Sequence, residues 1–279
     1  MAKLAVLVVH GMGTQPDDYA DPMIDELNDR LRALGQNPDH VLWKAAHWSH
    51  VLDGRENDLY RRLAQNHDLD WGTLRRSLVL SGLGDAVAYQ GPATAPSAVY
   101  EPIHRVLADA LEALGKGFTD ADMTPLVVMA HSLGGTIVSN YIWDAQRQPD
   151  RHPGRSPFTR CETLSGIITF GCNLPLFTLA IPPEHVTPIT FPGAGAAAAF
   201  PGSTTAQREA ALHWNNYFDP DDVLGYPLRP INAAYGRTVH EDREIQTGTI
   251  LSAHTEYWTD NSFTVPVARQ LERLLQLLG

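Results

Sequence analysis

The sequence predicts an α/β fold in which about six mostly parallel strands lie between helices. Short runs rich in valine, isoleucine and leucine recur along the chain, and amphipathic helical stretches separate them. This alternation is typical of a parallel sheet covered by helices on both faces. The 279 residues are 43% hydrophobic and 19% charged, the composition of a chain that can bury a core. We expect a single domain over residues 1–279.

The first part of the chain supplies two strands and one helix. The apolar run 4–9 predicts the first strand. Its six residues before His10 are fewer than the roughly 7 to 15 of a secretion-signal core, and no small-residue cleavage site follows. Apolar residues at helical spacing over 22–34 predict a helix that Gly35 ends. Residues 41–46 form the second predicted strand.

The middle of the chain is mainly helical. A long region without a convincing strand covers roughly residues 58–114. We therefore expect a helical insertion over 50–120. The third strand is predicted at 126–130 and leads into a helix over 134–146. The stretch 148–160, rich in proline, arginine and histidine, is typical of an exposed loop.

The last part of the chain completes the predicted sheet. Three more strands are expected at 165–170, 213–218 and 239–245, and a closing helix at 265–278. Residues 175–202 are rich in proline, alanine and glycine, which favours a flexible cap over a further part of the sheet. We expect this cap loop over 174–205.

The charge balance excludes a general nucleic-acid binder. Lysine and arginine number 21 against 32 acidic residues, a net charge of −11, whereas phosphate binding needs a basic surface. No apolar run approaches the roughly 18 residues of a membrane helix, so we expect no integral membrane association. Cys161 and Cys172 flank a predicted strand that holds them beyond disulfide reach. Two free thiols suit a cytoplasmic location.

The motif Ala-His-Ser-Leu-Gly-Gly at 130–135 stands between a predicted strand and a predicted helix. A serine on such a sharp turn has strained backbone angles, so the residues two before and two after it must be small. Here they are Ala130 and Gly134. The motif resembles the nucleophile elbow of the α/β-hydrolase family, with alanine in place of the usual glycine. The resemblance covers nearly the whole chain and implies that Ser132 is the nucleophile.

A second motif, His-Gly-Met-Gly at 10–13, follows the first predicted strand. It resembles the oxyanion loop of the same family, in which backbone N–H groups stabilise the developing charge on the carbonyl oxygen. The resemblance implies Met12 and Leu133 as the two donors. The alternative, a phosphate-binding glycine loop, lacks the spacing of both GxGxxG and GxxxxGK.

The base must come after the acid, because the partners in this fold follow the serine in the order acid, then histidine. Only His240 and His254 lie beyond a plausible acid. His240 falls inside the predicted last strand, whereas His254 lies in the loop between that strand and the last helix. The family places its base in that loop, so the resemblance implies His254.

Three aspartates follow the predicted strand 213–218. The family usually places its acid three or four residues past this strand and follows it with an apolar pair, which favours Asp222. Asp219 and then Asp221 are the alternatives. The chosen carboxylate would orient the imidazole and stabilise its charged form.

Together these residues imply a serine hydrolase of the esterase or lipase type that acts on a small-molecule ester through an acyl-enzyme, without cofactor or metal. Thioesterase, amidase and acyltransferase activities use the same triad. A catalytically inactive binding protein of this fold is the alternative from another class. His47 and His50 could offer two imidazoles to zinc, but no third ligand stands nearby, and we expect both to be structural.

Overall fold

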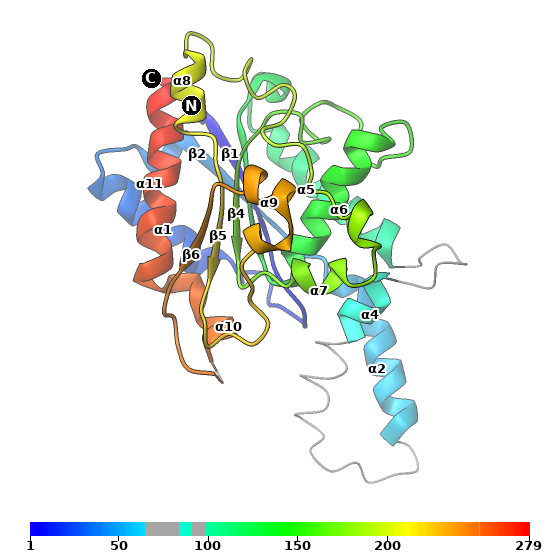
Figure 1. The fold of residues 1–279 in the computed structure, drawn as a ribbon. Helices are drawn as coiled ribbons and strands as arrows, with labels where there is room; N and C mark the ends of the chain where they lie inside the picture. Colours follow the sequence, from blue (N-terminus) through cyan, green and yellow to red (C-terminus); the bar gives the residue numbers. More distant parts are fainter. Residues whose placement is uncertain (65–83, 91–98, 251) are drawn as a thin grey trace.

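The computed structural model describes residues 1–64, 84–90, 99–250 and 252–279, and six strands of this part form one sheet. They are β1 (Leu4–Val9), β2 (Val41–Ala46), β3 (Leu126–His131), β4 (Leu164–Phe170), β5 (Trp214–Phe218) and β6 (Glu241–Glu244). Their order is β2-β1-β3-β4-β5-β6, and every neighbouring pair is parallel (Figure 1). The predicted class, a parallel sheet between helices, is confirmed.

The central strands β1, β3 and β4 are buried along their whole length, which explains their nearly uninterrupted apolar sequences. Side chains alternate across the sheet. Val6 and Val8 of β1 therefore enter one core, and Leu7 and Val9 enter the other. The edge strand β6 has the polar sequence Glu-Asp-Arg-Glu and is only partly buried.

Two long helices, α1 (Asp21–Ala33) and α11 (Asn261–Leu278), cover one face of the sheet (Figure 1). Met23 of α1 and Leu271 of α11 pack in the same core as Val6. Helix α11 begins before the predicted residue 265, because the Asp260 side chain accepts a hydrogen bond from the Ser262 N–H and caps the helix.

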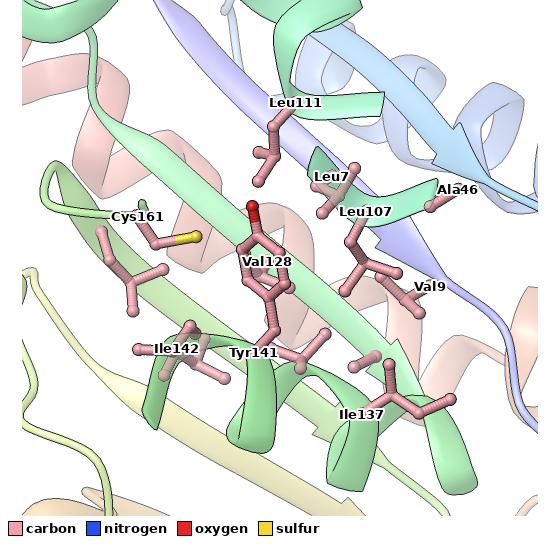
Figure 2. Packing of buried hydrophobic residues seen from close by; sticks show 14 of the residues in the cluster. Leu7, Val9, Ala46, Leu107, Leu111, Val128, Ile137, Tyr141, Ile142 and Cys161 are labelled. Atoms are coloured by element: carbon pink, nitrogen blue, oxygen red, sulfur yellow. The ribbon is translucent and has the colours of Figure 1, made fainter. Parts of the chain in front are cut away.

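Helices α5 (Tyr100–Gly115) and α6 (Leu133–Arg147) cover the opposite face. Figure 2 shows Leu107 of α5 and Ile137 of α6 in the core that also holds Leu7 and Val9. Helix α6 follows β3 directly, so the end of the central strand and the start of a buried helix share one turn.

The predicted helical insertion over 50–120 is described in part. Its described elements are α2 (His50–Ala64), α4 (Gly84–Gln90) and α5, and they include no strand. Residues 65–83 and 91–98 of the expected insertion lie outside the described residues. Helix α4 lies beside the start of α2 in Figure 1.

The prediction that 148–160 is an exposed loop is wrong in one respect. The segment has no helix or strand, but His152 and Phe158 are buried. His152 donates from Nε2 to the Tyr141 carbonyl oxygen and accepts at Nδ1 from the Gly154 N–H. These bonds hold the loop against α6. The polar composition of the segment does not predict this packing.

The expected cap loop over 174–205 divides into two halves. Its first half contains α7 (Leu174–Thr178), in which Leu174 is buried, Leu176 is exposed and the other three residues are half-buried. In the second half the Gly193 N–H donates to the Leu164 carbonyl oxygen, and Phe200 is buried. The second half is therefore anchored to the core. Helix α8 (Thr205–Glu209) follows this loop.

Two short helices flank β6 on either side in the sequence, α9 (Ala233–Thr238) before it and α10 (Ala253–Glu256) after it. Because all strands are parallel, the loops after β1, β3 and β5 and helix α10 meet at one edge of the sheet.

The described helices include none that is long and apolar enough to cross a bilayer. Cys161 and Cys172 are free thiols, and burial raises the pKa of each to about 12.

Candidate active site

Ser132 stands at the turn between β3 and α6 and has a backbone φ of 52° with ψ −125°. A non-glycine residue in this region is strained. The Ser132 N–H donates to the Phe170 carbonyl oxygen, and the Ser132 carbonyl oxygen accepts from the Gly135 N–H. The turn is therefore held on both sides of the strained residue.

Close backbone contacts explain the small residues around this serine. A Cβ added to Gly134 would lie 2.5 Å from the His10 carbonyl oxygen, so α6 approaches the end of β1 only with glycine there. A Cβ added to Gly11 would lie 2.6 Å from the Ser132 Cβ. The predicted oxyanion loop thus packs directly against Ser132.

The structure brings together Ser132 from the turn after β3, Asp222 from the loop after β5 and His254 from helix α10. His254 Nε2 lies 2.9 Å from Ser132 Oγ. His254 Nδ1 lies 2.9 Å from each carboxylate oxygen of Asp222. An imidazole that donates from Nδ1 to the carboxylate presents an acceptor at Nε2, so the Ser132 hydroxyl donates to it. This is the geometry that a general base needs.

Asp222 is held as a carboxylate. Its Oδ1 also accepts from the Leu224 N–H, and its Oδ2 accepts from the Tyr257 hydroxyl. Burial by itself would raise the pKa of Asp222, but the hydrogen bonds and charge of His254, with the other two donors, hold this pKa below its ordinary value.

The other two candidate acids have different positions. Asp219 accepts hydrogen bonds from the N–H groups of Asp221 and Thr247 and from the Thr247 hydroxyl. It fastens the loop after β6 to the turn after β5. The Asp221 side chain is exposed. Of the three aspartates, Asp222 is the one whose carboxylate reaches His254.

Tyr257 is fully buried. Its hydroxyl donates to Asp222 Oδ2 and accepts from the Asp219 N–H, each at 2.9 Å. Sequence reasoning missed this contact. The only sequence signal for it was the position of Tyr257, three residues after His254.

Replacing Tyr257 by phenylalanine is expected to lower the free energy of unfolding by about 1–3 kcal/mol, because a buried N–H and a buried carboxylate oxygen each lose a partner. Urea unfolding of the two proteins measures this difference. Turnover should fall far less than for a substitution of Asp222. Unchanged stability would mean that the hydroxyl contributes nothing to this network.

His131 is buried and hydrogen-bonded. Its Nε2 donates to the His254 carbonyl oxygen at 2.8 Å. Burial is the main cause that lowers the pKa of His131 to about 3, and the charge of the nearby His254 lowers it further. His10 is similar: Nδ1 donates to the Gly11 carbonyl oxygen, and Nε2 accepts from the Trp48 N–H. Burial lowers the pKa of His10 to about 3. Both imidazoles are therefore neutral.

These histidines make stability depend on pH. In the folded state His10, His104 and His131 take up protons only near pH 3, because burial lowers the pKa of each, whereas in the unfolded chain they do so near pH 6.5. Stability is therefore lost as the pH falls below 6.5, by up to about 1.4 kcal/mol per pH unit for each histidine. Asp219 and Asp222, whose pKa values are lowered, add to the loss only below their ordinary pKa of 3.8.

Urea unfolding at pH 7.0 and pH 5.5 measures this effect, and we expect a loss of up to about 4 kcal/mol between the two. The exposed His50, replaced by glutamine, is the matched control and should leave the loss unchanged. Equal stability at the two pH values would contradict burial of these three neutral imidazoles.

The loop 10–13, the predicted oxyanion loop, is held by α4. The Gly13 N–H donates at 2.8 Å to the carboxylate of Asp85, a buried residue of α4. Leu133 is the first residue of α6, where an amide has no acceptor within the helix. Met12 is half-buried and follows Gly11, which contacts Ser132. Gly11 and Ser132 are in contact, and each predicted donor follows one of them directly in the sequence: Met12 follows Gly11, and Leu133 follows Ser132.

The remaining histidine candidates do not join this site. His240 stacks on His213 with ring centroids 3.5 Å apart, just before β6. His47 lies 2.9 Å from an Asp17 carboxylate oxygen, and its ring is 5.9 Å from that of His50. Within the described ranges, no three His, Cys, Asp or Glu side chains are grouped as metal ligands.

The site is nearly closed. Ser132 is fully buried, and the His254 side chain keeps 22% of its surface exposed. Of the three side chains, His254 is therefore the one that solvent reaches.

No family model matches the chain, and no curated protein does. Among solved structures it is similar to polyneuridine aldehyde esterase, with 11% identity and a TM-score of 0.38 over 97% of this chain and 99% of that one. A proline iminopeptidase-related protein from Thermus thermophilus is 14% identical, with a TM-score of 0.40 over 99% and 91% of the two chains.

A third similar structure is an extracellular α/β-hydrolase from a Paenibacillus species, described as homologous to tobacco salicylic acid binding protein 2. It is 14% identical, with a TM-score of 0.32 over 96% of this chain and 97% of that one. The sheet order and the serine turn between β3 and α6 are those of the α/β-hydrolase fold.

Proposed function

We propose that the protein is a serine hydrolase that cleaves carboxylic esters through an acyl-enzyme. The observation that carries this proposal is the continuous hydrogen-bond chain from Ser132 Oγ through His254 to Asp222, with 2.9 Å at each link. The strained backbone at Ser132 supports it, because strain of this kind is maintained where it positions a reactive group.

In the first half of the reaction Ser132 Oγ attacks the ester carbonyl carbon while His254 Nε2 takes the hydroxyl proton. The carbonyl oxygen becomes an oxyanion, which the N–H groups of Met12 and Leu133 stabilise. Collapse of the tetrahedral intermediate breaks the bond to the alcohol oxygen, and His254 returns its proton to the leaving alcohol. The acyl group stays on Ser132.

In the second half a water molecule attacks the acyl-enzyme, and His254 takes its proton. The oxyanion forms again at the same two N–H groups, and its collapse releases the acid and restores the Ser132 hydroxyl. Asp222 carries negative charge throughout, because its lowered pKa keeps it ionised. It therefore stabilises the imidazolium that forms in each half.

The test is hydrolysis of an ester, a thioester and an amide that share one butanoyl group, with Ser132→Ala as the control. We expect saturable ester hydrolysis that this variant loses. Added alcohol should divert part of the product to a new ester if the acyl-enzyme accepts acceptors other than water. Cleavage of the thioester alone would make the protein a thioesterase, and a folded protein without Ser132-dependent turnover would be the inactive binding protein.

A further inference from the structure

A cavity of about 580 Å³ begins one helical turn beyond the proposed nucleophile. Five aromatic side chains, each from a different helix, line it: Tyr89, Tyr100, Trp143, Phe177 and Tyr235. Its volume is in the range of small-molecule sites. The mechanism proposed above uses none of these residues.

The cavity runs along α6 away from the serine. Thr136, Asn140 and Trp143 line it and follow Ser132 by 4, 8 and 11 residues. At a rise of 1.5 Å per residue they stand about 6, 12 and 16 Å along the helix from the elbow. The end of the cavity at Thr136 therefore lies about 6 Å along α6 from the elbow, a separation that a short spacer spans.

The walls of the cavity are tied to the candidate site. The Thr136 hydroxyl donates to Asn173 Oδ1, in the loop after β4, and the next residue, Leu174, lines the cavity. Tyr89 belongs to α4, whose Asp85 holds the Gly13 N–H of the oxyanion loop. In Figure 1, α4, α6, α7 and α9 lie near one another at this end of the molecule.

The chemistry of the lining favours an aromatic ring. Tyr89 and Tyr100 are stacked with centroids 5.1 Å apart and an interplanar angle of 25°, which presents an aromatic wall. Rings gain specific contacts on such walls beyond the area they bury. The α6 side of the cavity carries polar groups from Thr136, Ser139 and Asn140. An alkyl chain and an unsubstituted ring both lack hydrogen-bonding groups, so the preference for a ring rests on the aromatic side chains of the lining.

We propose that this cavity binds the acyl group of the substrate, and that this group is an aromatic ring on a short aliphatic spacer. The inference rests on the proposed function, since it places the ester carbonyl at Ser132. A ring bonded directly to the carbonyl stays at the elbow and does not reach the cavity. Polar ring substituents would find partners along the α6 wall.

The test compares 4-nitrophenyl esters that differ only in the acyl group. The 4-phenylbutanoyl and decanoyl esters each have ten acyl carbons, and the acetyl ester reports the triad alone. We expect kcat/KM at least tenfold higher for 4-phenylbutanoyl than for decanoyl, and a lower value for benzoyl. Equal values, or a preference for decanoyl, would overturn the proposal.

Variants assign the preference to the cavity. Trp143→Ala should reduce the tenfold preference to less than threefold. Phe177→Leu, a milder change in α7, should reduce it in the same direction. Trp43→Ala is the matched control, because Trp43 is a half-buried tryptophan that packs in the core of the opposite face and does not line this cavity. A preference that survives both cavity variants would overturn the proposal.

A binding measurement separates this inference from the proposed function. Titration calorimetry of methyl 4-phenylbutanoate into the Ser132→Ala variant needs no turnover. We expect saturable binding that the added Trp143→Ala change weakens at least tenfold. Absence of binding would overturn the cavity inference even if acetyl ester is cleaved. Binding without any acetyl ester hydrolysis by the wild-type protein would leave the cavity assigned and reject the hydrolase.

Discussion

Replacing Ser132 by alanine is expected to lower kcat for ester hydrolysis by about 10⁴- to 10⁶-fold, since it removes the atom that forms the acyl bond. Folding should be preserved, because the change deletes one buried hydroxyl at a turn held by backbone hydrogen bonds. Initial rates and the thermal unfolding midpoint measure the two effects. Full activity in the variant would exclude Ser132 as the nucleophile.

Asp222→Asn is expected to lower kcat by about 10⁴-fold, because an amide in place of the carboxylate favours the wrong imidazole tautomer and leaves the imidazolium without its counter-charge. Asp219→Asn is the matched comparison. Asp219 accepts from Thr247 and does not reach His254, so this variant should lose stability and keep kcat within about tenfold of the wild type.

If this assignment is right, steady-state kinetics gives Asp222→Asn the lower kcat of the two variants, and urea unfolding gives Asp219→Asn the lower stability. A larger loss of kcat for Asp219→Asn would move the acid to Asp219 and would contradict the hydrogen bonds to His254.

The strands were predictable because most of them are buried on both faces. Strands β1 and β2 have the predicted bounds, and β3 and β4 differ from theirs by one residue. Continuous apolar runs mark such strands in any sequence. β6 is shorter than the predicted 239–245, since an edge strand with polar residues has no such run to define its ends.

The local part of the site was also predictable. The serine turn needs a strand, small flanking residues and a helix within about a dozen positions, so a single sequence segment carries the whole signal. Asp222 and His254 came from family order, and the structure brings both to Ser132. Whether they act as acid and base is what the variants test.

The long-range part of the site was not predictable. Tyr257 contacts Asp222 from 35 positions away in the sequence, and Asp85 contacts Gly13 from 72 positions away. No periodicity or motif encodes such pairs. The same holds for burial of His152, because its hydrogen bonds depend on how the loop folds back onto α6.

The most direct test of the proposed site is incubation of the folded protein with a small fluorophosphonate, followed by intact-mass and peptide mass spectrometry. The reagent reacts with serines that a neighbouring base activates and assumes no substrate. We predict a single adduct on Ser132 that forms far more slowly in His254→Ala. An adduct on another residue, or no adduct on the folded wild-type protein, would contradict a working Ser132–His254–Asp222 triad.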